Sequence, residues 1–369
     1  MLNTLLLRRS RSRSFLLITA LVICILTVTL IVRTQMRQKS VLRDFRNDQQ
    51  LKEFQRVVST WPNGKPKAVI YFLTYEASFW RMKVAVRHLD TYFNQNFQYP
   101  VVVFYEGNVT DRDLTDLTDI STSRIFFQKI HFNQPYYLNV SVEEAVKDIT
   151  CPKPDRSRFP GYNHMSRFHA RLVAQQPILA NITWYFRLDD DSLLQDYITY
   201  DIFRFMQDNH YTYGYNLVFF DNPLCLTYLK ENITHYLKVN SIEPKEYSDW
   251  PDGGIFYNNF EVSRFDFWRR PDVVRFLKFI DESGGIYHYR WGDAPIKSAA
   301  VLIFLPRQQL YHFRKIKYYH GPWYPGFGET ITLFEAIKWI SVGSLSTCLV
   351  LVILLCCYLY LRIRNKIIS

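Results

Sequence analysis

The 369-residue chain is poor in cysteine, and it contains no internal repeat and no low-complexity segment. The missing repeat leaves no support for a repeat architecture. Only Cys151 and Cys225, of six cysteines, lie outside two long apolar runs, so the central part can form at most one internal disulfide. In an oxidising compartment these two thiols could pair, and the alternative is two free buried thiols.

The central part also lacks a strong excess of one charge. The formal net charge is +11, but seven basic residues at the two ends, with no acidic residue among them, account for most of it. These residues are Arg8, Arg9, Arg11, Arg13, Arg362, Arg364 and Lys366. A function in nucleic-acid binding therefore loses its main support, and we expect no nucleic-acid partner.

Two apolar runs, residues 15–32 and residues 339–361, contain no charged residue. Each is long enough to cross a bilayer as a helix. Basic residues precede the first run and follow the second, which predicts cytosolic tails at 1–14 and 362–369 and a lumenal or extracellular body between the spans. The first run could instead be a cleaved signal peptide, and the second could be a buried helix.

Four acceptor sequences for N-glycosylation support the lumenal placement, at Asn108, Asn139, Asn181 and Asn232. Residues 33–65 are charged and polar, which predicts a stem that holds a folded body of residues 66–330 away from the membrane. The sequence therefore favours a membrane-embedded protein with its body in the secretory pathway.

Apolar and amphipathic segments alternate along the body. They predict strands at 68–73, 99–105, 124–127, 184–188 and 211–220, and helices at 79–94, 162–179, 198–209 and 294–304, with another helix from Pro271 to near Gly284. This order predicts an α/β fold with a Rossmann-like sheet flanked by helices.

Three consecutive carboxylates, Asp189, Asp190 and Asp191, follow the apolar strand at 184–188. Ligands of open α/β sheets lie at the carboxyl ends of strands. Clustered carboxylates repel one another unless a cation or hydrogen-bond donors stabilise them, and hard divalent ions take such oxygen ligands and bridge to phosphates. The motif predicts a metal–diphosphate site of the Asp-x-Asp kind, and a solvated acidic turn is the alternative.

Three further side chains are candidates for chemistry. Glu261 is flanked by apolar residues, and a half-buried carboxylate near a sugar can act as a nucleophile or stabilise an oxocarbenium ion. Asp293 lies close to Trp291, whose ring could hold a sugar face, although Asp293 could also be a plain helix cap. His320 lies between aromatic residues and a glycine, so it could bind a metal or be structural.

Several of these motifs together resemble one family. The segments Asn259-Phe-Glu261, Gly284-Gly285, Arg290-Trp-Gly-Asp-Ala-Pro295 and Tyr319-His320 resemble the fungal-type Golgi α-1,2-mannosyltransferases of glycosyltransferase family 15. Upstream, Gly161-Tyr162 with Met165 and Arg167-Phe168, and Tyr185-Phe-Arg187-Leu-Asp189, are similar to two more of its motifs. The order and spacing agree over about residues 66–325.

The resemblance implies a GT-A fold, a Golgi membrane location, a GDP-mannose donor, a Mn²⁺ cofactor, a glycan acceptor and transfer with retention of configuration. It implies that Glu261 is the nucleophile and that Asp293 lies near the donor sugar. It implies that Tyr162 and Arg187 contact the phosphates of the donor and that His320 binds the metal, and Asp189 falls where the family has Glu. Together with the acidic motif and the ring beside Asp293, this predicts donor binding by Tyr162, Arg187, Asp189 and Trp291 and metal binding by Asp189, Asp191 and His320.

The chain departs from the family pattern at four points. Asp189-Asp190 replaces a Glu-Pro pair, Tyr257-Asn258 replaces the Trp-Ser that precedes Asn-Phe-Glu, Thr74-Tyr75-Glu76 stands where the family tends to carry a basic residue after the first strand, and the second apolar run is additional. Three other functions stay open from the sequence. They are a transferase of the same fold that uses a UDP-sugar, a catalytically inactive carbohydrate-binding membrane protein, and a membrane scaffold whose acidic run binds Ca²⁺.

Overall fold

A computed structural model describes residues 46–147, 149, 151, 159–321 and 324–326. The chain divides into two units, and the described residues of the first, 46–57, are helical. Every element discussed below belongs to the second unit, which begins at Val58. The predicted spans at 15–32 and 339–361 lie outside the described residues. In the part of the chain that is described, no helix combines the length and the apolar character needed to cross a membrane.

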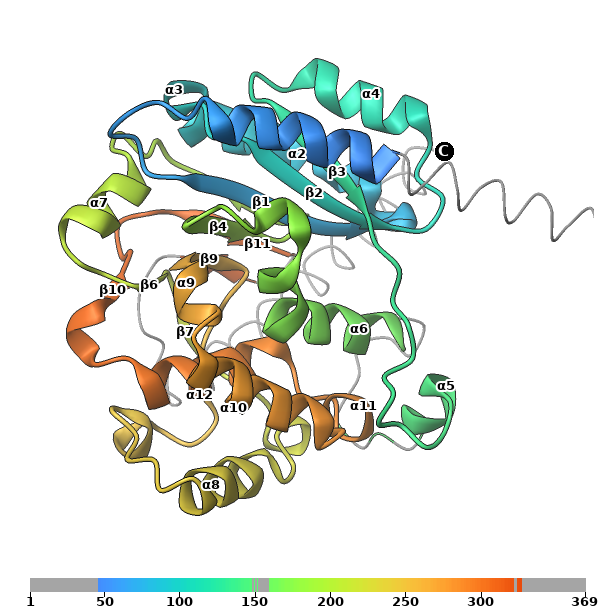
Figure 1. Cartoon of the computed structure of the whole chain (residues 1–369), viewed down its shortest axis with the longest axis vertical. Coiled ribbons are helices and arrows are strands. Elements are labelled where there is room, and N and C mark those ends of the chain that lie inside the picture. The colour runs from blue at the N-terminus through green and yellow to red at the C-terminus, as the bar shows by residue number, and fades with distance from the viewer. Residues whose placement is uncertain (1–45, 148, 150, 152–158, 322–323, 327–369) are drawn as a thin grey trace, which may run out of the picture. The chain divides into compact units, whose positions relative to one another are not determined.

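The second unit is built on a mixed β-sheet flanked by helices (Figure 1). Its strands are β1 Ala68–Tyr75, β2 Val101–Glu106, β3 Ile125–Lys129, β4 Trp184–Leu188, β5 Ser192–Leu194, β6 Tyr213–Tyr215, β7 Val218–Phe220, β8 Gly254–Phe256, β9 Phe260–Arg264, β10 Leu310–His312, β11 Tyr318–His320 and β12 Tyr324–Gly326. Its helices are α2 Phe79–Leu89, α3 Gln95–Phe97, α4 Asp111–Ile120, α5 Val142–Ala145, α6 Gly161–Arg167, α7 Ile202–Asp208, α8 Leu229–Val239, α9 Phe265–Trp268, α10 Pro271–Glu282, α11 Gly285–His288 and α12 Asp293–Phe304.

The main sheet has seven strands in the order β10-β6-β9-β4-β1-β2-β3. Strands β4, β1, β2 and β3 are parallel, as the alternation of apolar and amphipathic segments predicts. Strand β9 runs antiparallel to both of its neighbours, β4 and β6, which makes the sheet mixed. Small sheets, β12-β11-β5 and β7-β8, lie beside it.

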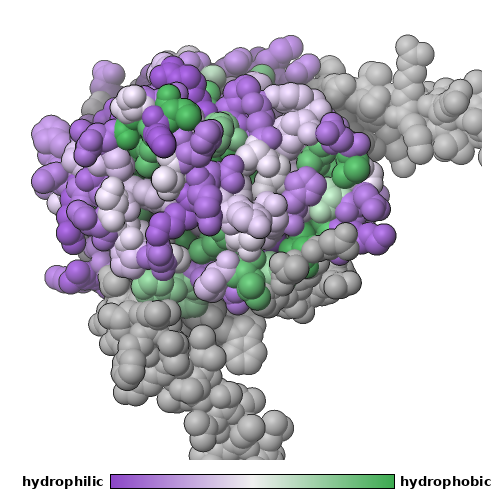
Figure 2. Space-filling view, turned by 90° about the horizontal axis from the view of Figure 1, so that it is seen from below, coloured by the Kyte–Doolittle hydropathy of each residue, from purple (hydrophilic) through white to green (hydrophobic). Residues whose placement is uncertain are grey.

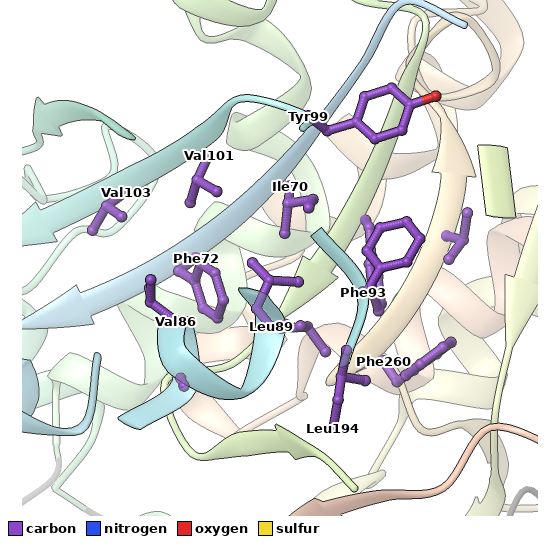
Figure 3. Close-up of a cluster of buried hydrophobic side chains, with 14 of the residues drawn as sticks. Ile70, Phe72, Val86, Leu89, Phe93, Tyr99, Val101, Val103, Leu194 and Phe260 are labelled. Atoms are coloured by element: carbon purple, nitrogen blue, oxygen red, sulfur yellow. The ribbon is translucent and has the colours of Figure 1, made fainter. Parts of the chain in front are cut away.

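One face of the main sheet forms the apolar core (Figure 3). Side chains alternate along a strand, so Ile70 and Phe72 of β1 point to the same face as Val101 and Val103 of β2. Residues such as Leu89 on the apolar side of α2 cover them. Each such buried side chain contributes roughly 1.5–3 kcal/mol relative to exposure.

The opposite face of the same strands is polar near the middle of the sheet. Arg187 of β4 lies directly opposite Glu261 of β9 in the strand register, and both are buried. On β1, the Tyr71 ring stacks on His169, which follows α6 in the chain. Lys297 of α12 reaches Glu261, so α12 covers this face, on the side of the sheet away from α2 and α4 (Figure 1).

Two segments differ from the sequence prediction. The expected single strand at 211–220 is divided into β6 and β7, which belong to different sheets. Asn216 separates them because its buried amide donates to the carbonyl oxygens of Phe313 and Ile316, at 2.8 and 2.7 Å, and this turns the chain out of the main sheet. The expected helix at 162–179 is regular only over α6, and irregular helical turns follow to Leu179.

Candidate active site

Arg187 joins two carboxylates at the carboxyl end of β4. Its Nη2 lies 2.9 Å from Asp189 Oδ1, and its Nη1 donates to Asp293 Oδ2. Burial by itself would lower the pKa of Arg187, but the Asp189 and Asp293 carboxylates outweigh burial and raise it well above the usual value. The guanidinium therefore stays charged and fixes two acidic groups that are 104 positions apart in the sequence.

Asp293 is the first residue of α12, and it does not act as a plain helix cap. The capping position is Gly292, which has no side chain to bond the helix amides. The Asp293 carboxylate turns toward the sheet, where Arg187 and the Asn258 amide both donate to Oδ2, the latter at 2.9 Å. The carboxylate is thus held by charge and by hydrogen bonding at the edge of the sheet.

The acidic triplet is divided among three environments. Asp190 points inward, where the Thr74 hydroxyl donates to Oδ2 at 2.8 Å and the Ser78 hydroxyl donates to the same oxygen. Burial raises the pKa of Asp190 to about 6 even though both hydroxyls oppose the shift. Asp190 ties the loop after β4 to the end of β1, and this inward middle residue produces an Asp-x-Asp arrangement.

Asp191 lies beside His320. Its Oδ1 is 3.2 Å from His320 Nδ1, which is also 3.1 Å from Ser192 Oγ. Antiparallel pairing of β11 with β5 sets this contact, because His320 lies opposite Ser192 in the register. Arg81 of α2 approaches Asp191 Oδ2 at 3.6 Å. Carboxylate oxygens suit Mn²⁺ and a neutral imidazole nitrogen is a common metal ligand, so these two side chains can bind one divalent ion.

The predicted third ligand, Asp189, is engaged differently. It accepts from Arg187 Nε at 3.0 Å, and within the described ranges no three His, Cys, Asp or Glu residues are arranged to hold a metal ion. The structure therefore groups Asp191 with His320 and assigns Asp189 to Arg187. An ion at this pair would need further oxygen ligands from a bound molecule.

Glu261 has a different environment from the one the sequence predicts. It is fully buried, its Oε1 lies 2.6 Å from Lys297 Nζ, and the Tyr185 hydroxyl donates to the same oxygen. No residue that the structure describes bonds Oε2. A nucleophile needs an open face toward the sugar, and Glu261 has none, so the structure does not support that role.

Trp291 is not placed to stack on a donor sugar, the role that the sequence predicts for it. The ring is fully buried, its indole nitrogen donates to the Thr227 carbonyl oxygen at 2.8 Å, and a Cβ at Gly285 would lie 2.4 Å from ring atoms. Its faces are covered by protein, so Trp291 cannot stack on a donor sugar. The contact explains why the Gly-Gly pair precedes the Arg-Trp-Gly-Asp motif, since only glycine leaves room for the ring.

Tyr162 lies beside the loop that carries Asp293. A Cβ at Gly292 would be 3.2 Å from the Tyr162 hydroxyl, and the Arg290 guanidinium lies 4.2 Å from the centre of the ring. Burial raises the pKa of Tyr162 to about 12 against the effect of Arg290, so the hydroxyl stays protonated and can donate a hydrogen bond. Tyr162, Arg187 and Asp293 thus gather around one loop.

The predicted disulfide lies next to this loop, since Arg290 Nη1 is 3.4 Å from Cys151 Sγ. Cys151 and Cys225 form a disulfide in the structure, with an S–S distance of 1.96 Å. The predicted glycosylation sites Asn108, Asn139 and Asn181 are exposed, whereas Asn232 lies in α8 and is half-buried. Glycosylation itself stays a prediction.

Sequence reasoning missed three residues of this region: Asn258, Lys297 and Arg81. Of these, Lys297 could have been found. Phe260 to Arg264 alternates apolar and polar residues, which is the pattern of a strand. A predicted strand at β9 would have placed Glu261 within the sheet, where a buried carboxylate needs a charged partner. Lys297 in an otherwise apolar helix was a signal of the same kind. Arg81 gave no local signal.

The fold and the sequence both have known relatives. The structure superposes on core-mannan synthase A (CmsA/Ktr4) from Aspergillus fumigatus in its Mn/GDP form with a TM-score of 0.66 and 21% identity, covering 73% of this chain and 78% of that one. For the S. cerevisiae mannosyltransferase Ktr4p in complex with GDP, the TM-score is 0.64 and the identity 22%, over 76% of this chain and 82% of that one. These likenesses establish a GT-A-like α/β fold.

Among curated proteins, the glycolipid 2-alpha-mannosyltransferase of Saccharomyces cerevisiae is 27% identical over 277 residues, which are 70% of this chain and 62% of that protein. The α-1,2-mannosyltransferase KTR1 of the same yeast is 26% identical over 70% of each chain. The matched region spans less than two thirds of the first of these relatives. The family described as glycolipid 2-alpha-mannosyltransferase matches residues 30–332, most of the sequence. This chain belongs to that family, glycosyltransferase family 15.

Proposed function

We propose that this chain is an α-1,2-mannosyltransferase that moves mannose from GDP-mannose to a hydroxyl group of a mannoside. The observation that carries the proposal is that Arg187 holds two carboxylates, those of Asp189 and Asp293. They lie close to the contact of Asp191 with His320. Relatives with mannosyltransferase in their names, and related structures described as holding GDP and Mn, support the donor and the reaction.

Asp191 and His320 are the residues that we assign to a divalent ion, Mn²⁺. The fit rests on their chemistry, a carboxylate oxygen and an imidazole nitrogen in contact at 3.2 Å. When bound, such an ion supplies positive charge against which a diphosphate can leave. Diphosphate oxygens would complete its ligand set.

Arg187, Tyr162 and Asp293 are the residues that we assign to the sugar and the diphosphate. Arg187 remains a cation and holds the carboxylate of Asp293 in one orientation, and the protonated Tyr162 hydroxyl can donate to a phosphate oxygen. Both contacts of Asp293 are made to Oδ2, so we assign Oδ1 to the hydroxyl groups of the sugar substrates. In a retaining, same-face reaction the leaving phosphate accepts the proton of the attacking hydroxyl.

We assign Glu261 an indirect role, without contact to the sugar. Its ion pair with Lys297 and its hydrogen bond from Tyr185 keep a carboxylate on the same face of the sheet as Arg187. It contributes to the electrostatics around Arg187 and forms no bond to the sugar.

We propose that the body of residues 66–330 works in the lumen of the Golgi, anchored by the apolar runs at 15–32 and 339–361. Exposed acceptor asparagines and the Cys151–Cys225 disulfide support an oxidising, glycosylating compartment. In sealed Golgi vesicles, added protease digests only what faces the cytosol. Because both tails are predicted to be cytosolic, we expect tags at both ends to be digested and the body to be protected.

The purified full chain should release GDP from GDP-mannose in the presence of Mn²⁺ and methyl α-mannoside, and the product should carry an α-1,2 linkage by NMR. Asp293→Asn should lower the rate by at least about 100-fold, the loss typical of removing one charge-stabilising group from an active site. Lys317→Met, at an exposed ion pair with Asp196, serves as the control. Equal turnover of a UDP-sugar, or binding of mannosides without transfer, would refute the proposal.

A further inference from the structure

Arg81 approaches the acidic triplet from helix α2. It is the third residue of that helix, and its Nη1 lies 3.6 Å from Asp191 Oδ2 and 3.8 Å from Asp190 Oδ1. In Figure 1, α2 lies on the opposite side of the main sheet from α12, which begins at Asp293. The proposed reaction gives this arginine no role.

The helix itself does not explain the arginine. Partial positive charge at the amino-terminal end of a helix favours acidic side chains there and disfavours basic ones. The first turn of α2 nevertheless contains Arg81 and no acidic residue. The end of β1, where the chain reads Thr74-Tyr75-Glu76, has no basic residue. The cation on this side of the triplet therefore comes from α2, at some cost to the helix.

An ordinary surface ion pair has a different geometry. Figure 2 shows the end of the molecule that carries α8, where hydrophilic side chains separate the hydrophobic patches. On α8, Lys230 lies 2.6 Å from Asp252, and both side chains are largely exposed. Arg81 is farther from its two carboxylates, and their side chains are only 12% and 31% exposed. Close pairing in water therefore does not account for its position.

The Arg81 side chain can reach a bound molecule. It is one-third exposed, and its guanidinium carbon lies 5.7 Å from the centre of the exposed Trp80 ring. Both contacts with the triplet are made by Nη1, at distances longer than a hydrogen bond. A guanidinium group carries five N–H donors in a planar fork that matches phosphate oxygens. Arg81 therefore keeps donors for a phosphate group.

Asp191 is shared between Arg81 and the residues that we assign to the metal. Its Oδ1 is in contact with His320, whereas its Oδ2 faces Arg81. With a divalent ion at Asp191 and His320, Arg81 would lose its partner and face a second cation. A diphosphate bound to that ion would bring negative charge back beside Arg81. The arginine should therefore oppose binding of the ion alone and favour binding of the ion together with a diphosphate.

We propose that Arg81 binds the diphosphate of the donor and pairs with Asp191 only while the site is empty. The inference rests on the proposed function and deepens it, because it makes the binding of Mn²⁺ and of GDP cooperative through one named side chain. In the reaction, the same cation stabilises the negative charge of the departing GDP.

The test uses the full chain and three variants. Arg81→Met removes the charge and keeps an apolar stem, and Arg81→Lys keeps a charge without the planar fork. Lys83→Met is the matched control, because Lys83 lies in the same helix, has 32% exposure against 33% for Arg81, and pairs with Asp116 at 2.8 Å. All three variants should unfold at the denaturant concentration of the wild type.

Two titrations measure the coupling. Electron paramagnetic resonance of free Mn²⁺ gives the Kd for the ion without nucleotide, and calorimetry gives the Kd for GDP at saturating Mn²⁺. Arg81→Met should lower the Kd for Mn²⁺ by up to about fivefold, because a partly exposed ion pair no longer competes for Asp191. It should raise the Kd for GDP by at least about tenfold, as expected for the loss of a charged hydrogen bond. Arg81→Lys should lie between Arg81→Met and the wild type, and Lys83→Met should match the wild type.

The opposite signs of the two changes separate a phosphate contact from a structural role. If Arg81→Met weakens the binding of both Mn²⁺ and GDP, the arginine positions Asp191, and the assignment is overturned. If Arg81→Met equals Lys83→Met in both titrations while the wild type transfers mannose, the assignment is overturned and the proposed function stands. A wild type that binds no GDP in the presence of Mn²⁺ would overturn the proposed function and the role of Arg81 with it.

Discussion

Removing Lys297 should damage the protein more than removing any exposed lysine. Lys297 and Glu261 are 1% and 0% exposed, and their charged atoms are 2.6 Å apart beneath the candidate active site. Lys297→Met leaves the apolar stem in place, next to the Trp268 ring, and removes only the charge. The variant therefore isolates the ion pair from the packing of the side chain.

The size of the effect follows from burial. Removing one partner of a buried ion pair leaves an uncompensated charge and typically costs about 3–5 kcal/mol, whereas replacing both partners is often close to neutral. We expect Lys297→Met to lower the free energy of unfolding by that amount. Adding Glu261→Gln should recover at least about 1 kcal/mol of the loss, because the carboxylate that lacked its partner is then neutral.

Chemical denaturation followed by tryptophan fluorescence measures both effects. Lys317→Met, which removes an exposed lysine 3.8 Å from Asp196, is the control and should cost at most about 1 kcal/mol. A loss for Lys297→Met no larger than that of the control, or a double variant whose loss equals the sum of the single losses, would refute the reasoning. Transfer activity separates the roles of Glu261: a stable double variant that still transfers mannose would agree with our assignment, because glutamine cannot replace a nucleophilic carboxylate.

Three other predictions concern pH, redox state and metal. Burial, assisted by Arg167, lowers the pKa of His164 to about 4, so the unfolded chain takes up a proton first as the pH falls. The free energy of unfolding should therefore decrease from about pH 6.5 toward pH 4. The denaturation midpoint of His164→Gln should change less than that of the wild type over this window, and equal changes in both proteins would contradict the lowered pKa. Reduction of the disulfide between Cys151 and Cys225, 74 positions apart, should cost about 2–4 kcal/mol, and labelling of both thiols before reduction would contradict that bond. His320→Ala should raise the Mn²⁺ concentration needed for half-maximal GDP binding by at least about tenfold, and an unchanged titration would exclude His320 as a ligand.

Strands β1, β2, β3 and β4 and helix α2 could be predicted because their burial pattern is local, whereas α4 and α5 were not predicted. In β1 and β2, β-branched and aromatic residues form continuous buried runs, which is what a central parallel strand requires. The family could likewise be identified from the sequence, because the motif from Arg290 to Pro295 is contiguous. The conformation of this six-residue motif depends on residues nearby in the chain, such as Gly285, which leaves room for the Trp291 ring.

The partners of the charged residues were decided by tertiary structure alone. The sequence contains Glu261, Lys297, Arg187 and Asp293, but only the antiparallel insertion of β9 beside β4, and the seating of α12 against the same face, determine which of them meet. A carboxylate in water and a carboxylate paired inside a sheet look identical in a sequence, since burial depends on residues far away along the chain. The sequence by itself determined the family and the kind of chemistry, and the packing of distant segments decided that Asp293 pairs with Arg187 and that Glu261 lies buried against Lys297.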